Sequence, residues 1–130
     1  MIDMSSLVLN PDGFIPAVIV DHESGRVLTL CYMTPEALEK TVDEGEVYVY
    51  RRSLAKLMKK GDTSGHTQHV REVRVDCEGK SIEIRVEQKV AACHEGYFSC
   101  YYRRLDPATG RWFTTDEQVF NPKNVYGDRP

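Results

Sequence analysis

The chain has 130 residues, of which 41% are hydrophobic and 28% charged, a balance typical of one globular domain spanning residues 1–130. A formal net charge of −3 gives no electrostatic basis for nonspecific nucleic-acid binding, and no apolar run approaches the ~20 residues of a membrane span. The first residues, MIDMSSLVLN, lack the basic cluster of a signal peptide. We therefore expect a cytoplasmic protein, in which cysteines more often bind metal or do chemistry than form disulfides.

The first third of the chain predicts a hairpin followed by a helix. Two apolar stretches separated by HESG predict paired strands at residues 14–21 and 26–33. The next segment, TPEALEKTVDEGE, predicts a short helix. Thr34 suits the N-cap, Pro35 the first helical position and Gly45 the end.

The middle of the chain predicts a strand, a loop and a second hairpin. The β-forming residues of EVYVY predict a strand at 46–50. The basic, glycine-containing stretch 51–68 is typical of a functional loop. Alternating apolar and polar residues then predict a hairpin over 70–88 with its turn at EGK, although Val70 falls out of phase with the other valines.

The remaining residues predict one more hairpin and an irregular tail. CYYRRLD and GRWFTTD flank the turn PATG, and the tail 120–130 is expected to be a loop packed on the surface. The predicted fold class is therefore α+β, mostly antiparallel β with one or two short helices.

Three of the four cysteines suggest a metal site. Cys77, Cys93 and Cys100 are sixteen and seven residues apart, at a strand end and on either side of HEGYFS. Three thiolates can hold zinc and leave a fourth position for water, whose pKa zinc lowers toward ~7. A neighbouring histidine, here His94, can move protons. The spacing alone also allows buried structural cysteines, which is our interpretation of Cys31 in RVLTLCYM.

The basic stretch RRSLAKLMKKGDTSGH suits phosphate. Its glycines let the backbone approach an anion, its hydroxyls and amides donate hydrogen bonds, and its arginines can grip phosphate oxygens in pairs. A solvated basic loop is the alternative.

Taken together, these residues resemble the phosphoribosyl-AMP cyclohydrolase family of histidine biosynthesis, from about Phe14 to Arg103. KGDTSGHTQ is similar to the family's lysine-glycine-acid-threonine-serine-glycine-histidine stretch, and ACHEGYFSCYYR to its alanine-cysteine-histidine and serine-cysteine-aromatic signature. RRS lies where the family has serine-arginine-serine, DCEGK where it has Asp-Cys-Asp-Gly-Asp, and the cysteine spacings agree.

The resemblance implies an intertwined homodimer with zinc held by Cys77, Cys93 and Cys100 across the subunit interface. It implies a nucleotide substrate whose adenine ring carries a second ribose phosphate on N1. Water activated by zinc would add to C6, and the N1–C6 bond would break. His94 is the predicted general base or acid, and His66 is a weaker second candidate.

The resemblance also predicts further site residues. The two substrate phosphates would be bound by residues from the basic stretch and the 76–80 turn: Arg51, Arg52, Ser53, Lys60, Thr63, Ser64 and Lys80. His22 and His69 have no such context, and we interpret them as surface residues.

The acidic motif departs from the family pattern. The family's second metal, magnesium, is held by the three acids of its motif, whereas here the positions are Asp76, Glu78 and Lys80. Lysine offers no oxygen ligand. Two alternatives follow: Asp76 and Glu78 bind magnesium weakly, or Lys80 replaces it as a fixed cation. A related zinc hydrolase or deaminase acting on another purine nucleotide, and a nucleotide-binding zinc dimer without catalysis, also stay open.

Overall fold

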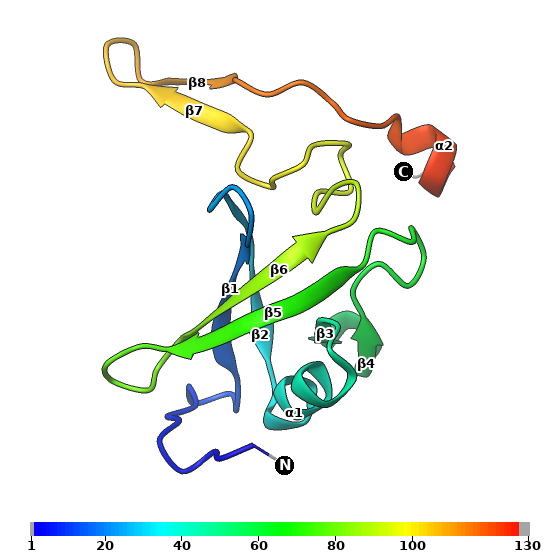
Figure 1. The fold of residues 1–130 in the computed structure, drawn as a ribbon. Coiled ribbons are helices and arrows are strands. Elements are labelled where there is room, and N and C mark those ends of the chain that lie inside the picture. Colours follow the sequence, from blue (N-terminus) through cyan, green and yellow to red (C-terminus); the bar gives the residue numbers. More distant parts are fainter. Residues whose placement is uncertain (1, 128–130) are drawn as a thin grey trace.

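The computed structural model describes residues 2–127, and its elements follow the predicted order closely (Figure 1). The strands are Ile15–Asp21 (β1), Val27–Met33 (β2), Tyr48–Arg51 (β3), Lys56–Lys59 (β4), Gln68–Val75 (β5), Ile82–Gln88 (β6), Arg103–Asp106 (β7) and Arg111–Thr114 (β8). The helices are Pro35–Glu44 (α1), the 3-10 turn Arg52–Leu54 (η1) and Pro122–Tyr126 (α2).

The main sheet has the strand order β2-β1-β6-β5. The predicted hairpins β1–β2 and β5–β6 are confirmed as antiparallel pairs, and β1 joins them by pairing in parallel with β6. The register of β5 shifts between Val70 and Glu72, and this bulge is the reason that Val70 falls out of phase in the sequence. The predicted α+β class is confirmed.

Helix α1 covers one face of the main sheet and begins and ends where predicted. The Thr34 hydroxyl accepts a hydrogen bond from the Ala37 amide at 3.1 Å, and Gly45 ends the helix with a φ of 73°. The buried Thr41 hydroxyl accepts from the Tyr48 amide at 2.9 Å and so ties α1 to β3. The core between helix and sheet contains buried residues of several elements: Ile15, Ala17, Ile19, Leu38, Ile82, Ile84 and Val86.

Two predictions of irregular structure are wrong in part. The stretch 51–68 contains η1 and the strand β4, which pairs with β3 and places Leu57 against the core. A four-residue strand is too short for its alternation to stand out from a loop. In the tail, Asn121 accepts a hydrogen bond from the Lys123 amide at 3.0 Å and starts the short helix α2, while residues 128–130 lie outside the described chain.

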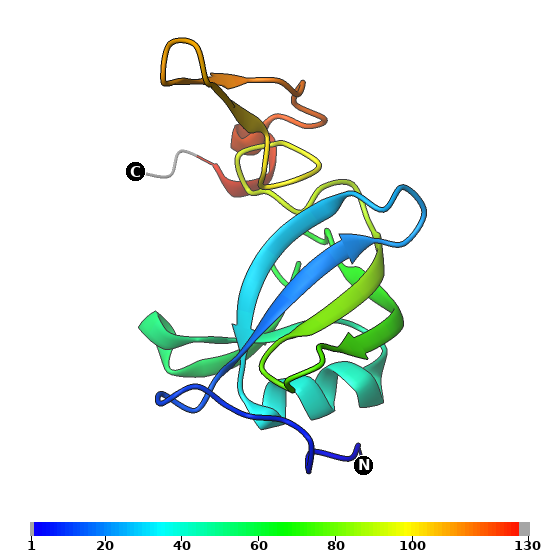
Figure 2. The same cartoon turned by 90° about the vertical axis from the view of Figure 1, so that its left-hand side faces the viewer.

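The hairpin β7–β8 extends away from the main sheet, at the top of Figures 1 and 2. We call residues 103–114 the arm. Its strands pair only with each other, as predicted for this hairpin. Arg26 anchors the base of the arm, donating hydrogen bonds to the Tyr101 carbonyl at 3.0 Å and to Asp116 at 2.9 Å.

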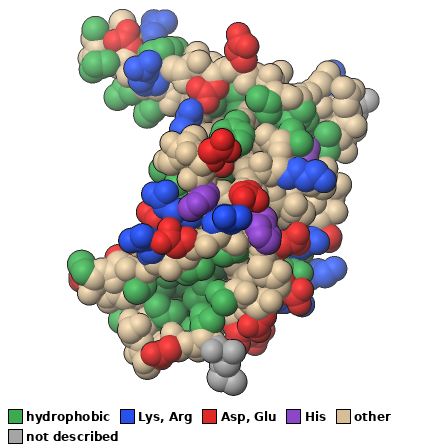
Figure 3. Space-filling model, viewed as in Figure 1, with side chains coloured by type: hydrophobic (Ala, Val, Ile, Leu, Met, Phe, Trp, Pro, Cys, Tyr) green, Lys and Arg blue, Asp and Glu red, His purple; other side chains and the backbone are tan. Residues whose placement is uncertain are grey.

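One face of β5–β6 carries paired charges, while Val73 and Val75 of β5 are partly exposed on the other. Arg74 pairs with Glu72 at 2.8 Å and Arg85 with Glu83 at 3.1 Å, and Figure 3 shows charges of both signs gathered across the middle of the charged face. Within residues 2–127, no helix is long and apolar enough to span a membrane.

Candidate active site

Cys93 and Cys100 lie together in the loop that follows β6. The Cys93 side chain is 5% exposed and makes a hydrogen bond with the Cys100 side chain. Burial raises the pKa of the Cys93 thiol, and Cys100 raises it further, while the backbone N–H groups of Glu95 and Tyr97 lower it. Two adjacent sulfurs with amides directed at one of them form a cradle that suits a thiolate-binding cation.

Backbone contacts to β2 fix Cys100 in this cradle. The Cys100 amide donates to the Leu28 carbonyl at 2.7 Å. The fully buried Ser99 hydroxyl donates to the Val27 carbonyl at 2.7 Å and accepts from the Tyr101 amide at 2.9 Å. Every one of these groups is therefore satisfied, and the Cys100 thiol is presented from a fixed backbone.

Cys77 lies at the opposite end of the β5–β6 hairpin, and its side chain is exposed. Six residue steps along β6 span roughly 20 Å, so the turn that carries Cys77 and the Cys93 loop cannot meet within one chain. Figure 1 shows this turn at the lower left and the chain after β6 at the upper right. Accordingly, no three His, Cys, Asp or Glu side chains converge on one point among residues 2–127.

The two candidate catalytic histidines have different surroundings. His94 is exposed beside the cradle, with its Nε2 atom 3.3 Å from Glu95 Oε1. His66 packs edge-on against the Phe120 ring, with ring centroids 4.8 Å apart. Burial, followed by the nearby charge of Lys89, lowers the pKa of His66. His94 is therefore accessible to solvent and substrate, whereas the lowered pKa of His66 favours its neutral form.

The basic residues fall into two groups at opposite ends of the β3–β4 hairpin. Arg51 pairs with Lys56 at the tip, where η1 also holds Arg52 and Ser53. Lys60, Thr63 and Ser64 follow β4 at its base. Three residue steps along β4 separate the groups by roughly 10 Å.

Lys60, Thr63 and Ser64, at the base of the β3–β4 hairpin, belong to a tightly closed turn over residues 60–66. The Gly65 amide donates to the Gly61 carbonyl at 2.7 Å, and a Cβ atom on Gly61 would lie 2.5 Å from the His66 carbonyl carbon. Glycine is therefore required at position 61, where φ is 85°. Within this turn the Ser64 hydroxyl accepts a hydrogen bond from the His66 amide at 3.1 Å.

The turn over residues 76–80 is occupied by its own hydrogen bonds. Asp76 Oδ1 accepts from the amides of Glu78 at 3.0 Å and Lys80 at 2.9 Å, and its Oδ2 accepts from the Ser81 hydroxyl at 2.6 Å. These donors, the Ser81 hydroxyl first, lower the pKa of Asp76. The Lys80 ammonium lies 3.2 Å from Glu78. Both carboxylates thus have contacts within or beside the turn, and the third position, Lys80, offers no oxygen ligand for a magnesium ion.

Comparison with known proteins places these features in a family. A model of the family described as phosphoribosyl-AMP cyclohydrolase matches residues 29–102. Proteins of that name from Haloquadratum walsbyi and Pelotomaculum thermopropionicum are 48% and 44% identical to the chain, over 90% and 98% of its length and 85% and 98% of theirs. The protein of that name from Haloarcula marismortui is 49% identical over 92% of the chain and 96% of its own length.

The chain belongs to the phosphoribosyl-AMP cyclohydrolase family. The matched range contains all the predicted site residues, from Arg51 to Cys100. The arm and the tail lie beyond its last residue, 102. Residues 1–28 lie before its first residue, and the relative from Pelotomaculum thermopropionicum matches 98% of the chain, these segments included.

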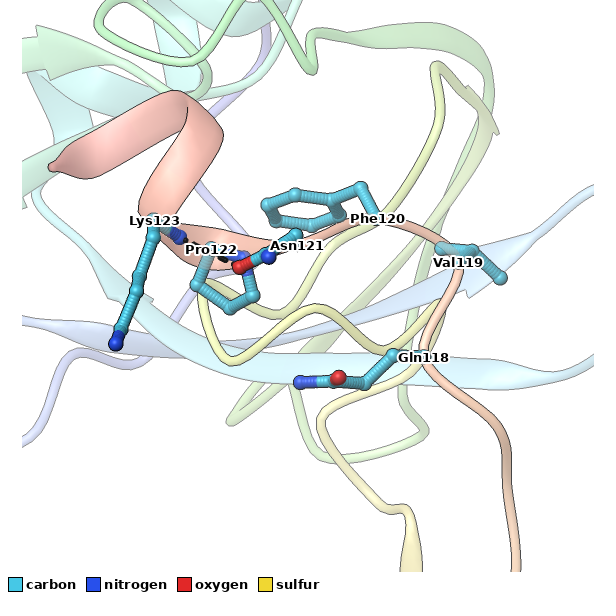
Figure 4. A pocket seen from close by; sticks show the side chains of 6 residues that line it. All are labelled: Gln118, Val119, Phe120, Asn121, Pro122 and Lys123. Carbon is cyan, nitrogen blue, oxygen red and sulfur yellow. Dashed lines mark hydrogen bonds between the residues drawn. The ribbon is translucent and has the colours of Figure 1, made fainter.

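The tail holds the cradle in place, a role that the sequence analysis missed. The Gln118 side-chain amide donates to the Glu95 carbonyl at 2.8 Å, and the Val119 amide donates to the Gly96 carbonyl at 2.7 Å. Phe120 then reaches His66. Residues 118–123 line a hollow of about 550 Å³, in which Figure 4 shows the Asn121 side chain bonded to the Lys123 backbone. No local pattern reveals this role, because its partners lie more than twenty residues away.

The remaining cysteine and histidines lie apart from the cradle. The Cys31 thiol approaches the Ala17 carbonyl at 3.7 Å within the sheet, and burial raises its pKa to about 11. Such a thiol is inert, which agrees with our structural interpretation. His22 and His69 are exposed, as predicted for surface residues.

Proposed function

We propose that this chain is a phosphoribosyl-AMP cyclohydrolase of histidine biosynthesis, which opens the adenine ring of its nucleotide substrate by hydrolysis of the N1–C6 bond. The observation that carries the proposal is the likeness, at 44–49% identity over nearly the whole chain, to proteins that bear this name. The proposal places the protein in the cytoplasm, where reducing conditions keep cysteine ligands available.

We further propose that Cys77, Cys93 and Cys100 hold zinc, with Cys77 donated by a second copy of the chain. The paired thiols of the cradle fit a zinc ion, and the exposed Cys77, roughly 20 Å away in its own chain, is free to reach another copy. Bound zinc would act as a Lewis acid that brings the pKa of water toward ~7. An isologous homodimer would form two such sites.

The proton transfers fall to His94. Alkylation of N1 makes C6 electrophilic, so water can add there once a base takes its proton. The Glu95 carboxylate orients the His94 ring through Nε2, which leaves the opposite nitrogen to accept that proton and to return it to N1 as the N1–C6 bond breaks. Water supplies the oxygen on C6 and two protons: one passes to N1 through His94, and the other moves from the C6 hydroxyl to the exocyclic nitrogen as the carboxamide forms, so the step balances.

The two basic groups suit the two phosphates of the substrate. Lys60, Thr63 and Ser64 form a turn with hydroxyl and amide donors near His66, and the arginines lie at the other end of the hairpin. We assign one phosphate to each group. Lys80 is proposed to supply positive charge beside Glu78, where the family pattern has a third acid.

Mixing two inactive variants tests the shared site. Cys77→Ser and Cys93→Ser chains each lack one ligand, but a heterodimer of the two contains one complete set. Random exchange of chains should restore about a quarter of the wild-type zinc and ring-opening activity, followed by ultraviolet absorbance with phosphoribosyl-AMP.

The matched control is a mixture of Cys93→Ser and Cys100→Ser. Both residues come from the same cradle, so no heterodimer contains a complete set and no activity should return. Restoration in both mixtures, or in neither despite an active wild type, would contradict the shared site. A wild-type protein that loads zinc but leaves phosphoribosyl-AMP unchanged would contradict the proposed activity itself.

A further inference from the structure

The tip of the β3–β4 hairpin holds three cations, Arg51, Arg52 and Lys56. Arg51 lies opposite Lys56 in the register of the hairpin, and Arg52 follows directly in η1. Like charges directly opposite one another destabilise a strand pair. Among residues 2–127, no acidic side chain forms an ion pair with any of the three. The tip therefore suits an anion such as phosphate.

Of these three cations, Arg52 has a contact that fixes its side chain. Its guanidinium carbon lies over the ring of Phe14, 5.2 Å from the ring centroid. A guanidinium attracted to a ring face keeps its N–H donors in its own plane, where they can bind a phosphate in pairs. Within residues 2–127 these donors make no hydrogen bond to the protein. Arg52 is thus held in place with its donors unused.

The Phe14 ring beneath Arg52 is itself fixed. Phe14 directly precedes β1 and is 8% exposed. Asn10 holds both of its backbone groups, because the Asn10 Oδ1 atom accepts from the Phe14 amide at 2.9 Å and the Asn10 amide donates to the Phe14 carbonyl at 2.8 Å. Tyr50 of β3 packs on the ring, with centroids 5.9 Å apart. The ring is therefore held both through its backbone and by packing.

The backbone that carries Arg52 is closed by a tight turn. The Ala55 amide donates to the Arg52 carbonyl at 3.2 Å, and Ala55 has a φ of 47°. A residue with a side chain keeps such a φ only where its surroundings enforce it, and these positions cluster at functional sites. The turn therefore presents Arg52 in a defined orientation.

We propose that Phe14 is a positioning residue for substrate binding: its ring holds the Arg52 guanidinium so that Arg52 binds the phosphate at the tip of the hairpin in pairs of hydrogen bonds. The inference rests on the proposed function, which supplies the phosphate. No contact within residues 2–127 fixes the Arg51 side chain, so Arg51 contributes charge without a fixed donor geometry.

Pre-organisation of Arg52 affects substrate binding more than turnover. Ordering a long, mobile side chain on binding costs conformational entropy, and a side chain that is already held avoids this cost. A phosphate contact that is equally strong in the ground state and the transition state changes KM and leaves kcat unchanged. Loss of the Phe14 ring should therefore appear in KM.

Phe14→Leu tests this role, because it keeps an apolar side chain and removes the ring face. The KM of the zinc-loaded enzyme for phosphoribosyl-AMP should rise about threefold to tenfold, with kcat changed by less than about twofold. Arg52→Gln should also raise KM. In the Arg52→Gln background, Phe14→Leu should add less than about twofold, because the ring then has no guanidinium to hold.

Arg52→Lys tests the same contact without a change in the core. Arg52 is exposed, and lysine keeps the charge but lacks the planar group that stacks on a ring and binds phosphate in pairs. The KM should again rise about threefold to tenfold. Lys56→Gln is the matched control, since it removes a charge at the tip without touching Phe14, and KM should change by less than about twofold at 0.15 M salt.

Two results would overturn the inference while leaving the proposed activity in place. An equal rise in KM from Phe14→Leu with and without Arg52 would show that Phe14 only stabilises the fold. An Arg52→Lys protein with the KM of the Lys56→Gln control would show that the stacked guanidinium is not needed. A zinc-loaded wild type that leaves phosphoribosyl-AMP unchanged would instead contradict the proposed function on which the inference rests.

Discussion

The two turns that carry the candidate zinc thiols are held in different ways. The 76–80 turn is organised mainly by its own side chain: the Asp76 carboxylate accepts hydrogen bonds from the Glu78 and Lys80 amides and from the adjacent Ser81 hydroxyl. Residues 6–8 contact it through Gly79, and its Cys77 is exposed. The Cys93 turn is organised from outside, by β2 through Cys100 and by the tail through Glu95 and Gly96. A turn closed by its own aspartate keeps its shape when it contacts another surface, and a turn held by β2 and the tail stays in place to receive it. The difference suits an assembly in which one turn donates a ligand and the other accepts it.

The largest expected effect concerns His94 in the Cys93 turn, to which we assign the proton transfers. His94→Ala should lower kcat by about 10²–10⁴-fold, the range for loss of general acid–base catalysis, with zinc content unchanged. Steady-state kinetics and elemental analysis on the same preparation would measure both. His22→Ala, at an exposed site outside the cradle, is the control and should change kcat less than twofold. Loss of zinc from His94→Ala would instead make His94 a ligand.

Local signals in the sequence predicted much of this architecture. The caps Thr34 and Gly45 and the alternation along β6 depend on neighbours in the chain, and they have their expected structural counterparts. The out-of-phase Val70 coincides with the register shift in β5, which the sequence analysis did not predict. The parallel pairing of β1 with β6 and the bracing of Gly96 by Phe120 join distant segments, and no local periodicity encodes them. The three cysteines could be selected from motif and spacing. That Cys93 and Cys100 lie together while Cys77 lies roughly 20 Å away became clear only from the length of β6 in the structure.

Two glycines test how each turn is held. Alanine at Gly79 would place its Cβ against the Ser6 carbonyl, and alanine at Gly96 would place it 2.6 Å from the Phe120 carbonyl. Both residues have positive φ, which alone costs about 1–2 kcal/mol for a residue with a side chain. Each substitution should therefore destabilise the protein by more than that amount, measured by urea denaturation at one fixed protein concentration.

Gly110→Ala supplies the control for this pair. Its φ is also positive, at 72°, but no atom lies within 4 Å of the Cβ position. Gly110→Ala should therefore lower the free energy of unfolding only by the cost of a positive φ, because its Cβ atom meets no neighbour. Gly96→Ala should in addition reduce zinc retention, because the displaced tail braces the cradle. Equal destabilisation by all three substitutions would argue against external bracing of the Cys93 turn.

A smaller effect concerns pH and the contact between the tail and His66. Burial lowers the pKa of His66 below its ordinary value of 6.5, so the unfolded chain binds this proton first as the pH falls. The stability gained from neutral His66 is thus fully present above pH ~6.5 and is lost as the pH falls through the folded pKa. His66→Gln should reduce the difference in urea midpoint between pH 7.5 and pH 5.5. The exposed His69→Gln should leave it unchanged, and an equal response of both variants would contradict the assignment.

The smallest effect is expected at the 76–80 turn, where the Lys80 ammonium lies 3.2 Å from Glu78. If this ammonium already neutralises the turn, a chelator that removes magnesium and spares zinc should change wild-type activity less than twofold. Lys80→Asp removes the ammonium and adds a carboxylate beside Glu78, so the variant should gain a magnesium requirement, because an uncompensated cluster of acids favours a hard dication. Titration of magnesium into both proteins at matched zinc content would measure the difference, with Lys89→Asp, a substitution outside the turn, as the control for an added acid. A strong magnesium requirement in the wild type would show that Asp76 and Glu78 suffice as ligands despite their present contacts, and Lys80 would then lose its proposed role.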